Sequence, residues 1–80
     1  MQPIKDLLNK IKWDKKENPE DYTIVYEDRI QKSYIEIPYI EIIRIEGTFM
    51  VLERDGEEVN IPLHRIRGVK KKEAVVWSRV

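Results

Sequence analysis

The chain has 80 residues, which is long enough for one small domain, residues 1–80. It has no cysteine, so disulfides and thiolate-bound zinc are excluded. Charged residues make up 38% of the chain and Glu, Lys, Ile and Val are abundant, a composition typical of heat-adapted proteins. The sequence shows no secretory leader and no apolar run long enough to span a membrane. We therefore expect a cytoplasmic protein from a heat-adapted prokaryote, with no membrane partner.

The net charge is zero, but the charges are unevenly distributed along the chain. Residues 1–16 contain five basic and two acidic residues, residues 17–58 contain four and twelve, and residues 64–79 contain six and one. If the two basic ends meet in the fold, they form one positive face suited to a polyanion. The alternative is a set of solvated surfaces that balance one another.

The first predicted element is a helix over residues 3–13, because Ile4, Leu7, Leu8 and Ile11 recur with helical spacing. A polar loop follows over residues 14–21. The rest of the chain alternates between β-forming runs and turn residues, with Asp55-Gly56 as a strong hairpin signal. The predicted strands are residues 22–28, 34–37, 42–46, 48–54, 58–61, 67–71 and 74–79, and the first of them is expected to be central.

A weak internal repeat joins two of these regions. Ile37-Pro38-Tyr39-Ile40-Glu41-Ile42 resembles Ile61-Pro62-Leu63-His64-Arg65-Ile66 in its spacing of proline and isoleucine. Because proline breaks a strand ladder, the repeat predicts two corners built in the same way, which favours a curled sheet or small barrel. Chance similarity in an Ile- and Glu-rich chain is the competing explanation.

The second copy of the repeat carries the only histidine in the chain, next to an arginine. His64 would donate a hydrogen bond to a phosphate oxygen, and Arg65 offers a planar guanidinium that matches phosphate geometry. The alternatives are a histidine that caps the turn and an arginine paired with the acidic middle of the chain. Asp28 and Arg29, at the end of a predicted strand, are either site residues or an ordinary ion pair.

The aromatic and lysine residues suggest fewer functional positions. Trp13, Phe49 and Trp77 are predicted to lie in the core, whereas Tyr26 is the tyrosine expected to present its hydroxyl at a site. Residues 70–72 are three lysines, which form either a solvated hairpin tip or a nonspecific attraction for a nucleic-acid backbone.

The usual catalytic signatures are absent from the sequence. It has no glycine-rich phosphate loop and no metalloprotease or nucleophile-elbow motif, and a single histidine cannot serve as both acid and base. We therefore expect a noncatalytic protein that needs neither a cofactor nor a metal.

Three segments together resemble a known family: Lys10-Ile-Lys-Trp-Asp14, Tyr26-Glu-Asp-Arg29 and Pro62-Leu-His-Arg-Ile66. This family is the archaeal RNA cyclic group end recognition domain, and the resemblance extends over nearly the whole chain. It implies recognition of RNA ends that carry a 2′,3′-cyclic phosphate, in association with RNA-processing or phosphoesterase proteins. The site residues that it implies are Asp28, Arg29, His64 and Arg65, with Tyr26 and Lys12 nearby.

We thus predict a single α+β domain with an N-terminal helix packed on a strongly bent, mostly antiparallel sheet. The sheet is expected to have five or six strands and to form an SH3-like or Sm-like barrel. The predicted function is noncatalytic binding of RNA ends. Two alternatives stay open: a protein–protein adaptor that uses a sheet edge or apolar patch, and a weak phosphoesterase that relies on His64.

Overall fold

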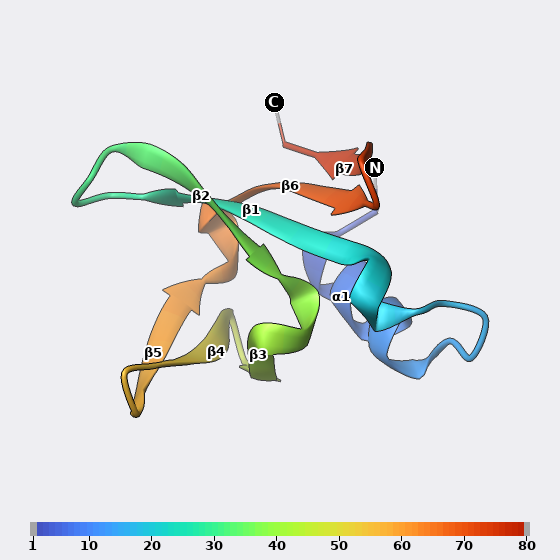
Figure 1. Ribbon diagram of the computed structural model, residues 1–80, viewed down its shortest axis with the longest axis horizontal. Helices are drawn as coiled ribbons and strands as arrows, with labels where there is room; N and C mark the ends of the chain where they lie inside the picture. The colour runs from blue at the N-terminus through green and yellow to red at the C-terminus, as the bar shows by residue number, and fades with distance from the viewer. Residues whose placement is uncertain (1, 80) are drawn as a thin grey trace.

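The computed structural model describes residues 2–79 and shows an α+β fold, as predicted. One helix precedes seven strands, and three short 3-10 helices lie before β1, β3 and β6 (Figure 1). The elements are α1 (Ile4–Trp13), η1 (Pro19–Asp21), β1 (Tyr22–Asp28), β2 (Ser33–Pro38), η2 (Tyr39–Glu41), β3 (Ile42–Glu46), β4 (Phe49–Arg54), β5 (Glu57–Pro62), η3 (Leu63–Arg65), β6 (Ile66–Lys71) and β7 (Ala74–Ser78).

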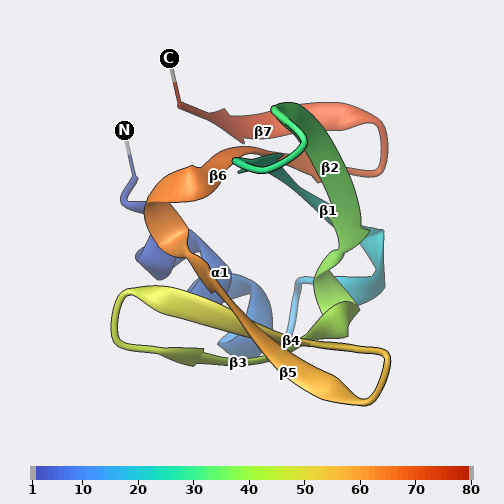
Figure 2. The ribbon, with the colours of Figure 1, turned by 90° about the vertical axis from the view of Figure 1, so that its left-hand side faces the viewer.

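The strands form two antiparallel sheets instead of one bent sheet of five or six strands. The first sheet has the order β2-β1-β6-β7, so β1 has a neighbour on each side, as expected, and the second has the order β3-β4-β5. In Figure 2 the two sheets face each other, with α1 behind the space between them. The sheets are not hydrogen-bonded into a closed ring, so the SH3-like or Sm-like barrel is not confirmed.

The two proline corners separate the sheets. The chain leaves the first sheet through Pro38 and η2, and it returns from the second sheet through Pro62 and η3. Both prolines have nearly the same backbone angles, φ −62° and ψ 139° for Pro38 and φ −59° and ψ 137° for Pro62. The predicted repeat is therefore present in three dimensions, and it interrupts the strand ladders that a single continuous sheet would need.

Helix α1 covers one end of the two sheets (Figures 1 and 2). Its four regularly spaced apolar residues are all buried, as their spacing predicted: Ile4, Leu7, Leu8 and Ile11. The buried Trp77 indole donates a hydrogen bond to the Gln2 carbonyl at 2.7 Å, and the Tyr39 hydroxyl donates to the Leu8 carbonyl at 2.8 Å. The first contact joins β7 to the residues before the helix, and the second joins η2 to the helix itself.

The core lies between the sheets and against α1. It is made of buried apolar side chains that include Ile24, Met50, Leu52, Ile66 and Val69. The prediction for Trp77 is confirmed, but Trp13 is 74% exposed and Phe49 is only half-buried. Trp13 follows Ile11 by two positions, which places it about 200° around the helix from the buried face. The Lys12 ammonium lies over its ring, 5.3 Å from the centroid.

The Asp55-Gly56 hairpin is confirmed. Asp55 has φ 52° and Gly56 has φ 80°, and both angles suit the tight turn that joins antiparallel strands. The turn places Arg54 opposite Glu57. It lies at the same end of the molecule as the β1–β2 turn, away from α1 (Figure 1).

Candidate functional site

Two predicted site segments converge at the end of the sheets opposite α1. Tyr26 and Asp28 lie in the last part of β1, Arg65 ends η3, and Tyr26 pairs with Ile66, the residue directly after η3. A pocket of about 220 Å³, here called the end pocket, lies between them. Its walls come from both sheets, and it is lined by Tyr26, Asp28, Ile30, Arg54, Val59, Asn60, Ile61 and Arg65.

Tyr26 is buried, with 2% of its surface exposed, and its hydroxyl faces the opposite sheet. That hydroxyl accepts a hydrogen bond from Nη2 of Arg54 at 2.5 Å. The Arg54 guanidinium lies 5.9 Å from the Tyr26 ring centroid. Because the hydroxyl accepts from Arg54, its own proton is available to a ligand.

Arg54 is a pocket residue that the sequence did not single out. It comes from the last position of β4, directly before the Asp55-Gly56 turn. The hairpin signal was visible in the sequence, so an arginine at the end of a hairpin was a detectable feature. Its position opposite Tyr26 was not, because that contact depends on how the two sheets face each other.

Arg65 is half-buried, and its Nε atom is fully enclosed. Within residues 2–79 this Nε–H finds no hydrogen-bond acceptor. Buried donors are normally paired, and an unpaired one is costly to the folded state. The alternative interpretation of Arg65, an ion pair with the acidic middle segment, is not found within the described residues.

Asp28 has a structural task in the β1–β2 turn. Its Oδ1 accepts hydrogen bonds from the backbone N–H groups of Ile30 at 2.8 Å and Gln31 at 3.2 Å. It therefore shapes the turn, and within residues 2–79 it makes no ion pair with Arg29. Arg29 is exposed next to the pocket residue Asp28 but is not part of the pocket lining.

His64 and Lys12 are also outside the end pocket. His64 is exposed on η3, and its backbone carbonyl accepts a hydrogen bond from Nη1 of Arg67 at 2.8 Å. The structure therefore places it beside the pocket residue Arg65, but not in the lining. Lys12 lines a different hollow, between α1 and β3, together with Ile40 and Ile43.

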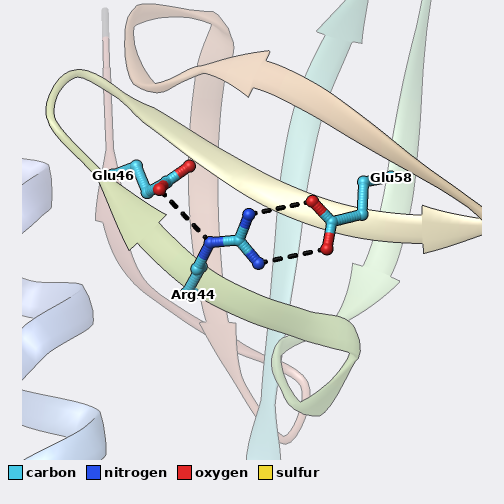
Figure 3. A network of polar contacts seen from close by, with 3 residues as sticks. All are labelled: Arg44, Glu46 and Glu58. Carbon is cyan, nitrogen blue, oxygen red and sulfur yellow. Dashed lines mark hydrogen bonds and ion pairs between the residues drawn. The ribbon is translucent and has the colours of Figure 1, made fainter.

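Arg44 provides a useful contrast to the pocket arginines. Its guanidinium donates to Glu58 at 3.1 and 2.8 Å and lies 3.4 Å from Glu46, across one face of the three-stranded sheet (Figure 3). Arg44 holds the pKa of the Glu58 carboxyl below its usual value through these hydrogen bonds. Arg44 is thus occupied by carboxylates, whereas Arg54 and Arg65 form no ion pair within residues 2–79.

Over residues 1–79 the sequence matches the family described as the MJ1316 RNA cyclic group end recognition domain. The chain belongs to this family. A UPF0248 protein of Saccharolobus solfataricus is 35% identical over 79 residues, covering 95% of each chain. A UPF0248 protein of Metallosphaera sedula is 38% identical and covers 95% of this chain and 91% of its own. No solved structure matches the chain at a significant level.

Family membership confirms the resemblance seen in the sequence, and the relatives come from thermophilic archaea, in agreement with the composition. The description of the family names the recognition of RNA ends. Within residues 2–79, no helix is long and apolar enough to cross a bilayer. No group of three or more potential metal ligands is found in that same range.

The two basic ends of this family member do meet, as the bond between Trp77 and Gln2 shows. They do not form one uninterrupted positive face, because several of their cations contact acidic residues from the middle of the chain. Lys70 pairs with Glu36 at 3.2 Å, and Lys71 pairs with Glu17 at 3.4 Å. The two arginines of the end pocket, in contrast, have no carboxylate partner within residues 2–79.

Proposed function

We propose that this chain is a noncatalytic RNA-binding domain that holds the terminal phosphate of an RNA, preferentially a 2′,3′-cyclic phosphate, in the end pocket. The observation that carries the proposal is that two arginines, Arg54 and Arg65, line one pocket and neither pairs with a carboxylate within residues 2–79. Charge-assisted hydrogen bonds from guanidinium groups are among the strongest contacts that a protein offers to phosphate.

In this proposal each polar group has a defined part. Arg65 and Arg54 donate to the phosphate oxygens, and the Tyr26 hydroxyl donates its free proton to the phosphate or the adjoining sugar oxygen. The Asn60 amide lines the same pocket and suits a ribose hydroxyl. The exposed His64 and Arg29 would contact the backbone just outside the pocket. Lys12, in its separate hollow, has no part in the site.

The charges of the pocket favour a cyclic phosphate over an open phosphate. Two guanidinium groups and the Asp28 carboxylate give the lining a net charge of one positive unit. A cyclic phosphate diester carries one negative charge, whereas a terminal monoester carries about −1.5 to −2 at neutral pH. The Asp28 carboxylate therefore repels the open form more strongly. Phosphate contacts carry no base information, so we expect little sequence preference.

The proposal is tested with three short RNAs of one sequence that end in 2′,3′-cyclic phosphate, 3′-phosphate or 3′-hydroxyl. Fluorescence anisotropy should show tighter binding of the cyclic end than of the hydroxyl end by about tenfold or more, which corresponds to one charge-assisted hydrogen bond. In Arg65→Met this preference should disappear. Arg44→Met is the matched control, because Arg44 is already held by Glu58 and Glu46.

Equal affinity of the wild-type protein for all three ends would refute recognition of the terminus. Loss of the preference in Arg44→Met would show that general positive charge, and not the end pocket, is responsible. The cyclic-phosphate RNA should also remain intact during the titration. Its hydrolysis, abolished by His64→Ala, would replace the binding proposal with the phosphoesterase alternative.

One observation favours the adaptor alternative. Ile40 and Ile43 are 59% and 44% exposed and line the hollow between α1 and the edge strand β3. Exposed apolar residues at an open sheet edge are suited to contact another protein. A pull-down from cell extract with and without nuclease separates the two functions, since partners of an adaptor survive the removal of RNA.

A further inference from the structure

The outer face of the four-stranded sheet, which points away from the three-stranded sheet and α1 (Figure 2), carries a second concave surface. It is a shallow groove of about 210 Å³, here called the sheet groove. Its lining includes Val25, Tyr34, Arg67, Gly68, Lys70 and Val75. The central strands of this sheet, β1 and β6, are flanked by β2 on one side and β7 on the other.

The floor of the sheet groove is low because of Gly68 and a β-bulge. Val25 pairs with Gly68 and Tyr26 pairs with Ile66, so Arg67 is an extra residue on β6. The bulge presents Arg67 on the same outer face as Gly68. A methyl group at Gly68 would lie 3.5 Å from the Trp77 carbonyl oxygen and 4.0 Å from Cβ of Val25, which are ordinary contacts. Gly68 thus leaves open a space that the fold could fill.

The walls of the sheet groove combine an aromatic ring, an aliphatic side chain and two cations. Tyr34 on β2 is 66% exposed and Val75 on β7 is 61% exposed, although both are large apolar residues. Arg67 and Lys70 lie between them on β6 and make ion pairs with Glu27 at 3.4 Å and Glu36 at 3.2 Å. Each of these cations makes a single contact to its carboxylate, whereas Arg44 makes two hydrogen bonds to Glu58 and a contact to Glu46. An incoming phosphate can therefore compete for Arg67 and Lys70 at little cost.

We propose that the sheet groove binds one unpaired base of a single-stranded RNA, stacked on Tyr34, with its backbone phosphate beside Arg67 and Lys70. An exposed aromatic ring on a β-sheet with neighbouring cations meets both requirements of single-strand binding, namely a stacking platform and charge complementarity to the backbone. An apolar floor suits the face of any base. The choice of RNA as the ligand rests on the function proposed above.

The position of Arg67 relates the sheet groove to the end pocket. Its guanidinium contacts the His64 carbonyl on η3 at 2.8 Å and the Glu27 carboxylate on β1 at 3.4 Å. The same short helix carries Arg65, which lines the end pocket. An RNA whose terminus occupies the end pocket would therefore pass η3 to reach the sheet groove, and the base bound there would precede the terminal nucleotide.

The test places the fluorescent base 2-aminopurine one nucleotide before the 3′ end of a short RNA and follows its quenching by the full chain. Stacking on Tyr34 should quench the fluorescence in the wild-type protein and in Tyr34→Phe. In Tyr34→Ala the quenching should disappear and the affinity should fall by about tenfold. Gly68→Ala, which puts a methyl group on the floor of the sheet groove, should weaken binding while the protein stays folded. Trp13→Ala removes a similarly exposed aromatic residue outside the groove and should change nothing.

The outcomes separate the two proposals. If Tyr34→Ala binds and quenches like the wild-type protein, the sheet groove is not a base site, whatever the end pocket does. If Tyr34→Ala lowers the affinity for cyclic-phosphate, phosphate and hydroxyl ends by the same factor, the groove is confirmed independently of end recognition. If Tyr34→Ala instead alters the sedimentation of the free protein and leaves RNA binding intact, the face is an interface between copies of this chain, and the proposal is overturned.

Discussion

Arg65 lies in the short helix η3 with an enclosed Nε–H that has no acceptor within residues 2–79. In the absence of a ligand, such a donor costs about 1–3 kcal/mol because it has lost its hydrogen bonds to water. The stem of the side chain still packs against its surroundings. In the proposed function, Arg65 serves phosphate binding at the expense of stability.

We predict that Arg65→Met leaves the free energy of unfolding unchanged or raises it by about 1 kcal/mol, since methionine keeps the apolar stem and removes the unpaired donor. Urea denaturation of both proteins, without ligand, provides the measurement. A loss of more than about 2 kcal/mol would mean that the guanidinium stabilises the fold through contacts of its own.

A second residue-scale prediction concerns the charge of Asp28. The substitution Asp28→Asn keeps a side-chain oxygen for the N–H groups of Ile30 and Gln31, but it removes the negative charge from the end pocket. The affinity for a 3′-phosphate end should therefore rise more than the affinity for a cyclic-phosphate end. The anisotropy titrations measure this ratio directly. A ratio that stays constant would show that Asp28 has no influence on the charge preference.

The candidate residues show which parts of the pocket were predictable from the sequence and which were not. Proline, histidine and arginine at one corner predicted an anion site, and three of the predicted residues, Tyr26, Asp28 and Arg65, share a pocket. The presence of Arg54 in this pocket was not predictable, because it lies on a strand of the other sheet. His64 and Arg29 are neighbours of lining residues, yet they face solvent, since the direction of a side chain in a tight turn depends on backbone angles that composition does not reveal.

At the scale of elements, the two proline corners determine the architecture. Each ends a strand of one sheet and leads into a strand of the other, and their backbone angles agree within a few degrees. Proline limits the unfolded chain to backbone conformations that the folded chain also adopts, so less conformational entropy is lost on folding. The corners should thus make similar and separate contributions to stability.

We predict that Pro38→Ala and Pro62→Ala each lower the free energy of unfolding by about 0.4–1 kcal/mol. The effects should add to within about 0.5 kcal/mol in the double variant, because the residues belong to different corners. Chemical denaturation of the three variants and the wild-type protein tests this. Loss of folding in one single variant, with no effect of the other, would contradict the equivalence of the corners.

The loop before η1 is attached to the first sheet by a polar cluster of Glu17, Tyr22 and Lys71. The Tyr22 hydroxyl donates to the Glu17 carboxylate, and Lys71 pairs with the same carboxylate at 3.4 Å. Burial, reinforced by the hydrogen bond to Glu17, raises the pKa of Tyr22 to about 12. The hydrogen bond from Tyr22 lowers the pKa of Glu17.

The raised pKa of Tyr22 gives a pH prediction. The unfolded chain releases the tyrosine proton near the ordinary pKa of 10.0, whereas the folded chain keeps it up to about 12. The stabilisation is therefore complete below pH 10 and is lost as the pH rises toward 12. Tyr22→Phe should remove this part of the alkaline loss, as measured by denaturation at a series of pH values. Tyr34→Phe, at an exposed tyrosine, is the control and should retain it.

At the scale of the whole molecule, the helix closes one end of the paired sheets and leaves the other end to the pocket (Figure 1). The class of fold, the helix and the strand runs were predictable because they follow from local periodicity. The division into two sheets was not, because a period-two pattern shows which side of a strand is buried but not which strand lies beside it. The exposure of Trp13, in contrast, was predictable, because the helical period places it about 200° from Ile11, away from the buried face.

The central claim is that a phosphate binds between the arginines of the end pocket, and NMR of the isotopically labelled full chain tests it most directly. On titration with a nucleoside 2′,3′-cyclic monophosphate, the Nε–H resonance of Arg65 should shift most. The resonances of Arg54 and of the Ile30 amide should shift with it. A titration in which these signals stay fixed while those around Lys12 move, or in which no signal moves, would contradict the claim.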